Sequence, residues 1–186
     1  MTEKLLEFLG TSNHDKELIY FLLNNQLITE PNLYIPLLDE DNEPLDEDTL
    51  YIANEEKGIC LLFRDEASCL DHLSDTAMLG KNLFFQTIFF YNQNVEGFNK
   101  YRELLPKGLN FDMSKVEIHD LLGSPDDVRE SLYSEKWCNL DCGYSIYIKY
   151  SAHHDGIRYI STTTSNYKAF KTIFFQRRSP RVFRYG

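Results

Sequence analysis

The nine-residue segment Leu83–Tyr91 constrains the fold of this chain more than any other part of its sequence. It is the longest apolar run, and it is interrupted by Gln86. A membrane-spanning helix needs about 20 apolar residues, so this run is too short to cross a membrane. A short apolar run of this kind is typical of a buried strand. We therefore expect Leu83–Tyr91 to lie at the centre of a sheet.

Other segments predict antiparallel strands around this one. Thr49–Asn54 and Gly58–Phe63 flank a turn with the sequence Asn-Glu-Glu-Lys-Gly, which is typical of a hairpin. The Asp155-Gly156 dipeptide is a second hairpin signal. The remaining expected strands are Lys136–Leu140, Gly143–Ser151, Ile157–Ser165 and Thr172–Gln176.

Helical patterns are concentrated before the strands. Leu5, Leu6 and Leu9 indicate a short helix that ends at Gly10. Ser12 or Asn13 is expected to cap a second helix that runs to about Leu27. Later in the chain, Phe98 and Tyr101 suggest a short helix. Ser114 and Glu117 form a capping box for a helix that runs through Leu122 and stops at Gly123.

This order of elements predicts the α+β class, with N-terminal helices packed on a mainly antiparallel meander sheet of about five to seven strands. We expect residues 1–186 to form a single domain, with a possible subdomain boundary near residue 110. The expected core consists of Leu18, Leu22, Ile59, Leu61, Phe85, Ile88, Phe90, Trp137, Ile146, Ile148 and Ile160.

Charge is distributed unevenly along the chain. The 29 acidic and 19 basic residues give a net charge of -10. Residues 1–60 hold 14 acids and three bases, a net of -11, whereas residues 156–186 hold seven bases and no acid, a net of +7. An acidic body attracts cationic partners and accelerates their association. The N-terminus lacks the basic start and apolar core of a secretory signal, so we expect a cytoplasmic protein.

Nine carboxylates lie between Asp39 and Glu56. This stretch lacks the central glycine that a calcium-binding loop needs, and Pro44 stands near where the turn is required. We expect a solvated loop or a docking surface for a basic protein, whose carboxylates mimic nucleic-acid phosphates if that protein is a nuclease. The partner-binding residues that we predict are Asp39, Asp41, Glu43, Asp46, Glu47, Asp48, Glu55 and Glu56.

No catalytic or cofactor motif occurs in the chain: the phosphate-binding loop, GxGxxG, HExxH and GxSxG are all absent. The pair His153 and His154 is a candidate metal or acid–base group, with Cys142 or His119 joining it in space. Neighbouring residues on a strand point to opposite faces, however, so exposed turn positions are the simpler expectation. The four cysteines lack zinc-site spacing and are expected to be reduced, mostly buried thiols. We therefore predict no catalytic residue, no metal, no cofactor and no enzymatic activity.

The C-terminal segment 170–185 interleaves aromatic rings with arginines, as single-stranded nucleic-acid sites do. The alternative is a terminal strand in which Phe174 and Phe183 are buried and the arginines pair with the acidic body. A net charge of -10 opposes the approach of a polyanion. Nucleic-acid binding is therefore the second hypothesis, beside a cytoplasmic chaperone or adaptor.

In its size, its acidity and its lack of catalytic motifs, the chain resembles the immunity proteins of bacterial toxin–immunity systems, including contact-dependent and polymorphic toxins. A local likeness covers roughly residues 110–165. There, a helix is followed by the sequence Leu-Gly-Ser-Pro-Asp, then Trp137 and strands, an order similar to domains of the outer-membrane assembly lipoprotein and β-lactamase-inhibitor type. Both resemblances imply a binding protein. We expect this chain to neutralise a basic toxin domain by covering its active surface.

Overall fold

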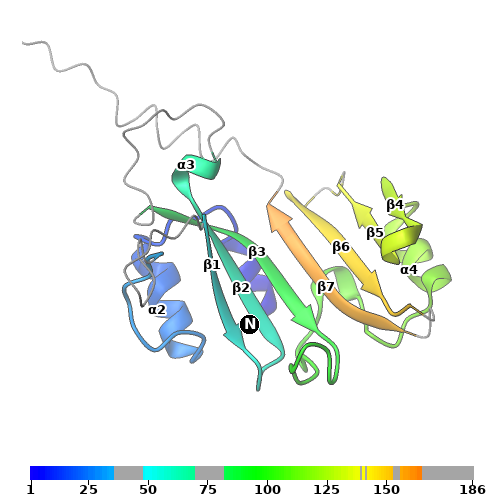
Figure 1. Cartoon of the computed structure of the whole chain (residues 1–186), viewed down its shortest axis with the longest axis horizontal. Helices are drawn as coiled ribbons and strands as arrows, with labels where there is room; N and C mark the ends of the chain where they lie inside the picture. The colour runs from blue at the N-terminus through cyan, green and yellow to red at the C-terminus, as the bar shows by residue number, and fades with distance from the viewer. Residues whose placement is uncertain (36–47, 70–81, 139, 141, 153–155, 165–186) are drawn as a thin grey trace, which may run out of the picture.

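The chain folds into an α+β structure with a seven-stranded antiparallel sheet, as its sequence predicts (Figure 1). This computed structural model describes residues 1–35, 48–69, 82–138, 140, 142–152 and 156–164. The strands are β1 (Thr49–Asn54), β2 (Ile59–Asp65), β3 (Leu83–Tyr91), β4 (Asp127–Arg129), β5 (Ser134–Trp137), β6 (Tyr144–Tyr150) and β7 (Ile157–Thr164).

The spatial order of the strands is β1-β2-β3-β7-β6-β5-β4. It consists of two meanders instead of one, because β3 is followed along the chain by β4 at the far edge and pairs in space with β7. The predicted hairpin of β1 and β2 is confirmed in the register Asn54↔Ile59. The strand expected over Lys136–Leu140 corresponds to β5, which begins two residues earlier, at Ser134, and ends at Trp137. The short strand β4 was not predicted. The expected strand Thr172–Gln176 and its basic segment lie outside the described residues.

Within the described residues, four α-helices and two 3₁₀ turns accompany the strands. The short N-terminal helix is present, but it ends at Glu7 with Phe8 as its C-cap, three residues before the left-handed Gly10 that was expected to end it. The second helix is capped by Asp15, whose side chain accepts hydrogen bonds from two backbone N–H groups, and not by Ser12 or Asn13. The capping box of Ser114 is confirmed. The elements are α1 (Thr2–Glu7), α2 (Lys16–Asn24), α3 (Glu66–Cys69), η1 (Pro106–Gly108), α4 (Lys115–Leu122) and η2 (Glu130–Leu132).

One hydrophobic cluster joins α1, α2 and α4 to one face of the sheet. Leu5, Leu22 and Ile118 are fully buried in this cluster together with the strand residues that face them. In Figure 1 the strands pass in front of α1. All eleven core residues predicted from the sequence are no more than 1% exposed. Within the part of the chain that the structure describes, no helix is long and apolar enough to cross a membrane.

The turn between β1 and β2 is held against the segment 99–101. Tyr91 N–H donates to the Gly58 carbonyl, and Tyr101 N–H donates to the Tyr91 carbonyl, each at 2.9 Å. A Cβ atom on Gly58 would lie 2.2 Å from the Asn99 carbonyl oxygen. The helix expected around Phe98 and Tyr101 is wrong: Phe98 forms an isolated bridge with Val95 in the loop, Tyr101 N–H donates to the Tyr91 carbonyl, and neither residue is helical.

Replacing Gly58 by alanine should destabilise the protein far more than replacing Gly97. Both glycines have positive φ, at +70° and +86°, so alanine costs about 1–2 kcal/mol at either position. Only Gly58 also meets backbone atoms. We expect its variant to lose at least about 2 kcal/mol more than Gly97→Ala in urea unfolding. Equal losses would show that the close approach is not a constraint on the fold.

Candidate functional site

An aromatic surface occupies the face of the sheet opposite α1, α2 and α4. The register places Tyr91 beside Tyr159, and Phe89 and Tyr147 on either side of Ser161. Side chains alternate between the two faces of a strand. Because the neighbours of these residues along the strands point into the core, their rings point the other way. We call this set the aromatic surface: Phe89, Tyr91, Phe98, Tyr147 and Tyr159.

The rings of the aromatic surface contact one another continuously across β3, β7 and β6. The ring centroid of Tyr159 lies 5.9 Å from Phe89, 5.6 Å from Tyr91 and 6.0 Å from Tyr147. Phe98 stacks on Tyr91 at 3.9 Å with an interplanar angle of 7°. Phe89, Tyr147 and Tyr159 remain partly exposed. Rings held by one another in this way lose little further freedom when a partner covers them.

The loop after β3 completes the aromatic surface. Asn94 and Glu96 adopt the left-handed conformation, with φ of 59° and 54°. Asn94 N–H donates to the Phe98 carbonyl at 2.9 Å, so the loop returns on itself and lays Phe98 against the sheet. The Asn92 side chain donates to the Ile157 carbonyl, which ties the loop to β7.

Tyr91 and Tyr159 are neutral hydroxyl groups at physiological pH. Burial, together with the neighbouring Tyr147 hydroxyl, raises the pKa of Tyr159 to about 12. Burial also raises the pKa of Tyr91, with a smaller effect from the thiol of Cys60. Neutral phenols contribute apolar area together with a hydrogen-bonding group, which is what aromatic anchors in protein interfaces offer.

Carboxylates lie at the hairpin end of the sheet, close to the aromatic surface. Glu55 and Glu56 are exposed on the turn between β1 and β2. Asn99 N–H donates to the Glu55 carbonyl at 2.9 Å, which brings this turn against the loop after β3. On that loop, Glu96 lies 3.6 Å from Arg158. Among the described residues, Arg158 pairs with Glu96 alone, and no ion pair engages Glu55 or Glu56.

The predicted partner-binding acids that the structure describes do not form one surface. Asp48 lies just before β1 and pairs with Arg64 at 3.1 Å. A hydrogen bond from Ser68, followed by this pairing, outweighs burial and lowers the pKa of Asp48. Glu55 and Glu56 follow β1, so about 20 Å of strand separates them from Asp48. The other predicted acids lie outside the described residues: Asp39, Asp41, Glu43, Asp46 and Glu47.

A second cluster of polar groups surrounds a buried carboxylate between α4 and the sheet. Glu135 on β5 is 4% exposed. It accepts hydrogen bonds from the Tyr150 hydroxyl at 2.7 Å, from His119 Nε2 at 3.0 Å and from Lys115 Nζ at 3.2 Å. His119 also meets the edge of Trp137, whose indole donates to the Gly123 carbonyl. These contacts hold α4 on the sheet.

Hydrogen bonds decide the protonation state of Glu135. Burial alone would raise its pKa, but the hydrogen bonds from Tyr150, His119 and Lys115 together outweigh burial and lower it. Glu135 is therefore a carboxylate at neutral pH, and its three donors supply the hydrogen bonds that a buried carboxylate needs. A carboxylate, an imidazole, an ammonium and a phenol are also groups that transfer protons, yet here the other three all donate to the Glu135 carboxylate.

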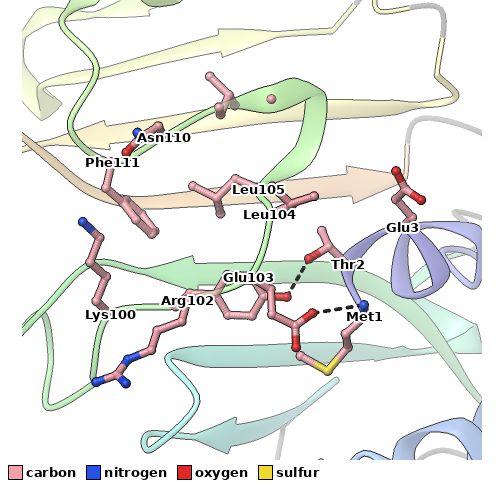
Figure 2. Close-up of a pocket in the computed structure, with 13 residues that line it drawn as sticks. Met1, Thr2, Glu3, Lys100, Arg102, Glu103, Leu104, Leu105, Asn110 and Phe111 are labelled. Atoms are coloured by element: carbon pink, nitrogen blue, oxygen red, sulfur yellow. Dashed lines mark hydrogen bonds and ion pairs between the residues drawn. The ribbon is translucent and has the colours of Figure 1, made fainter.

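A groove of about 860 Å³ lies between the N-terminus of α1 and the segment 100–111, which follows the loop after β3 (Figure 2). Thr2 and the Tyr101 hydroxyl share a buried hydrogen bond of 2.6 Å at its floor. Figure 2 shows Lys100 and Arg102 on one side and Glu3 on the other. Opposite charges in one groove favour no single class of ligand.

The described cysteines and histidines form no metal site. Within the described ranges, no group of three or more His, Cys, Asp or Glu side chains could hold a metal ion. Burial raises the pKa of Cys60 and Cys69 to about 11, so both are thiols at neutral pH. Cys142 donates to the Tyr144 carbonyl. The candidate pair His153 and His154 lies outside the described residues.

Comparison with protein-family models, with curated proteins and with solved structures gives no match.

Glu135→Gln should remove a stabilisation that depends on pH. Hydrogen bonds to a charged group contribute about 1.5–3 kcal/mol, so we expect a loss of this size at pH 7. Because folding lowers the pKa of Glu135, its contribution is complete above the ordinary glutamate pKa and falls as the pH drops through the folded value. The difference between wild type and variant in urea unfolding should therefore shrink towards pH 3. Asp120→Asn, at an exposed position on α4, is the control, and a constant difference across pH would contradict the assignment.

Proposed function

We propose that this chain binds and neutralises a basic protein, most simply a toxin domain of the nuclease type encoded next to it, as immunity proteins do. The observation that carries the proposal is the aromatic surface with exposed carboxylates at one end. Interfaces between proteins are centred on well-packed aromatic anchors and bordered by polar and charged groups. The partner is held by the rings and attracted by the acids.

The charge distribution supports a basic partner. The net of -11 over residues 1–60 gives the chain a field that steers cations towards it, including the exposed Glu55 and Glu56. Such carboxylates increase the association rate and the specificity more than the final affinity. An interface of standard size covers roughly 1,600 Å² in total. An inhibitor that occludes its target in this way needs no catalytic group and no cofactor. We propose that it acts in the cytoplasm, where a nuclease-type toxin would find its substrate.

We also propose that residues 1–186 form a single domain. One hydrophobic cluster supports this, because it contains Leu5 and Leu22, which precede residue 110, as well as Trp137 and Ile146, which follow it. A single domain of this kind unfolds in one cooperative step. We expect fluorescence and circular dichroism to report the same thermal midpoint. Two separate transitions would place a domain boundary inside the chain.

Co-expression with the toxin domain encoded by the adjacent gene tests the proposed function. We expect a complex that co-purifies and cells that survive the toxin. Tyr147→Ala should weaken the complex at least about 30-fold, the effect of losing an anchor worth about 2 kcal/mol. Tyr20→Ala removes an exposed tyrosine from α2, so it is a matched control that should bind as wild type does.

The carboxylates predict a kinetic effect in the same experiment. Glu55→Gln together with Glu56→Gln should slow association and reduce its dependence on salt, with little change in dissociation. If a neighbour of confirmed toxicity neither binds the chain nor is neutralised by it, the proposed function is wrong.

A further inference from the structure

Among the described residues, the strand β1 forms an edge of the sheet whose outer backbone groups have no backbone partner. It is the first strand in the spatial order and pairs only with β2 (Figure 1). Along the described chain, no backbone hydrogen bond reaches Thr49–Asn54 from any element other than β2. Unpaired edges of this kind are templates for the addition of a further strand.

The register identifies the groups that face outwards. Asp65 N–H donates to the Asp48 carbonyl at 2.7 Å, so these two residues form a hydrogen-bonded pair. Hydrogen-bonded and non-hydrogen-bonded pairs alternate along an antiparallel ladder. The N–H and C=O groups of Thr49, Tyr51 and Ala53 therefore point away from β2, outwards from the sheet.

The two edges of the sheet differ in a way that singles out β1. At the opposite edge, β4 has three residues and carries Asp127 and Arg129, which pair at 2.9 Å. A short, charged edge discourages pairing with another strand. In contrast, β1 has six residues, none of them charged or proline, and three of them are Thr, Tyr and Ile. Only β1 lacks the devices that protect an edge.

A groove of about 420 Å³ runs beside β1 on the side of the helices. Leu50 and Ile52 contribute from the strand, and Leu33 and Tyr34 contribute from the loop after α2. Tyr34 is 59% exposed. An added strand would hydrogen-bond to the edge while alternate side chains enter this groove, as in known cases of strand addition.

The charges around β1 determine which strand fits. Glu55 and Glu56 follow it, Glu30 lines the groove, and Arg64 neutralises only Asp48. If two copies paired through antiparallel β1 strands, the two glutamates of each would meet the ion pair of Asp48 and Arg64 of the other, which offers them no free cation. Opposite charges in opposed positions stabilise a strand pair. A strand that places a free cation opposite Glu55 and Glu56 is therefore favoured over a second copy.

We infer that β1 accepts an extended segment of the basic partner, with an uncharged β-forming centre and lysine or arginine at its ends. The inference rests on the proposed function for the existence of that partner and adds a main-chain contact to it. This contact lies at the sheet edge and is separate from the aromatic surface.

The test measures binding of a synthetic peptide to the full chain by fluorescence anisotropy. The peptide has the centre Thr-Val-Thr-Val-Thr between two pairs of lysines and carries a fluorescein label. We expect a Kd below about 1 mM. A peptide with the same centre and glutamates in place of the lysines should bind at least tenfold more weakly.

Variants of β1 separate edge pairing from simple charge attraction. Ala53→Pro removes an outward N–H without breaking a bond to β2, and proline is tolerated on edge strands. It should reduce peptide binding at least tenfold, whereas Ala53→Val, which keeps the N–H, should bind as wild type does. Circular dichroism checks that both variants fold. If the proline variant does not fold, methylating alternate peptide amides replaces it: one set should abolish binding and the other should not.

Three outcomes would overturn the inference: no binding of the lysine peptide, equal binding to Ala53→Pro, or equal binding of both methylated sets. A dimer seen by sedimentation that Ala53→Pro dissociates would also overturn it in favour of a second copy. Because the probe is a peptide, the results are distinguishable from failure of the proposed function. If Ala53→Pro still neutralises the toxin, the strand site alone is wrong; if the peptide binds but no toxin does, the proposed function alone is wrong.

Discussion

The antiparallel pairing of β3 with β7 joins the two meanders, and both faces of the sheet depend on its register. On the side of the helices it sets Phe90 beside Ile160 in the core. On the other side it sets Tyr91 beside Tyr159 in the aromatic surface. The Thr87 and Thr163 hydroxyls hydrogen-bond across the same pair at 3.0 Å. A shift of one residue would exchange the faces of a whole strand, so core and surface cannot change independently.

The fold class and the core were predictable because their signals are local. The apolar pattern of Leu83–Tyr91 and the capping box of Ser114 depend on residues close in sequence. The cap of α2 was predicted incorrectly because several residues able to cap occur in succession. Tertiary contacts decide between them: Asn13 accepts from Leu83 N–H and donates to the Leu33 carbonyl, which leaves the helix end to Asp15.

The candidate site was only partly visible in the sequence. Acidic residues can be counted without a structure, so the charge of Glu55 and Glu56 could be assigned to a surface. The aromatic surface could not be predicted without knowing which strands lie beside β3. These are β7 and, next to it, β6, about 60–70 residues later in the chain. The alternation of Phe89 and Tyr91 within Leu83–Tyr91 was the one local signal of a second aromatic face. Phe98 gave no such signal, because its position against the sheet depends on the left-handed conformation of Asn94 and Glu96 in the loop after β3.

We propose that a basic partner covers the rings of the sheet while the carboxylates guide it there. Hydroxyl-radical footprinting of the free chain and of its complex with the basic partner tests this directly, since it reports the solvent exposure of individual aromatic side chains. We expect Phe89, Tyr147 and Tyr159 to become protected in the complex, while the exposed Tyr20 on α2 does not. Protection of Tyr20 with unchanged oxidation of the three rings would contradict it.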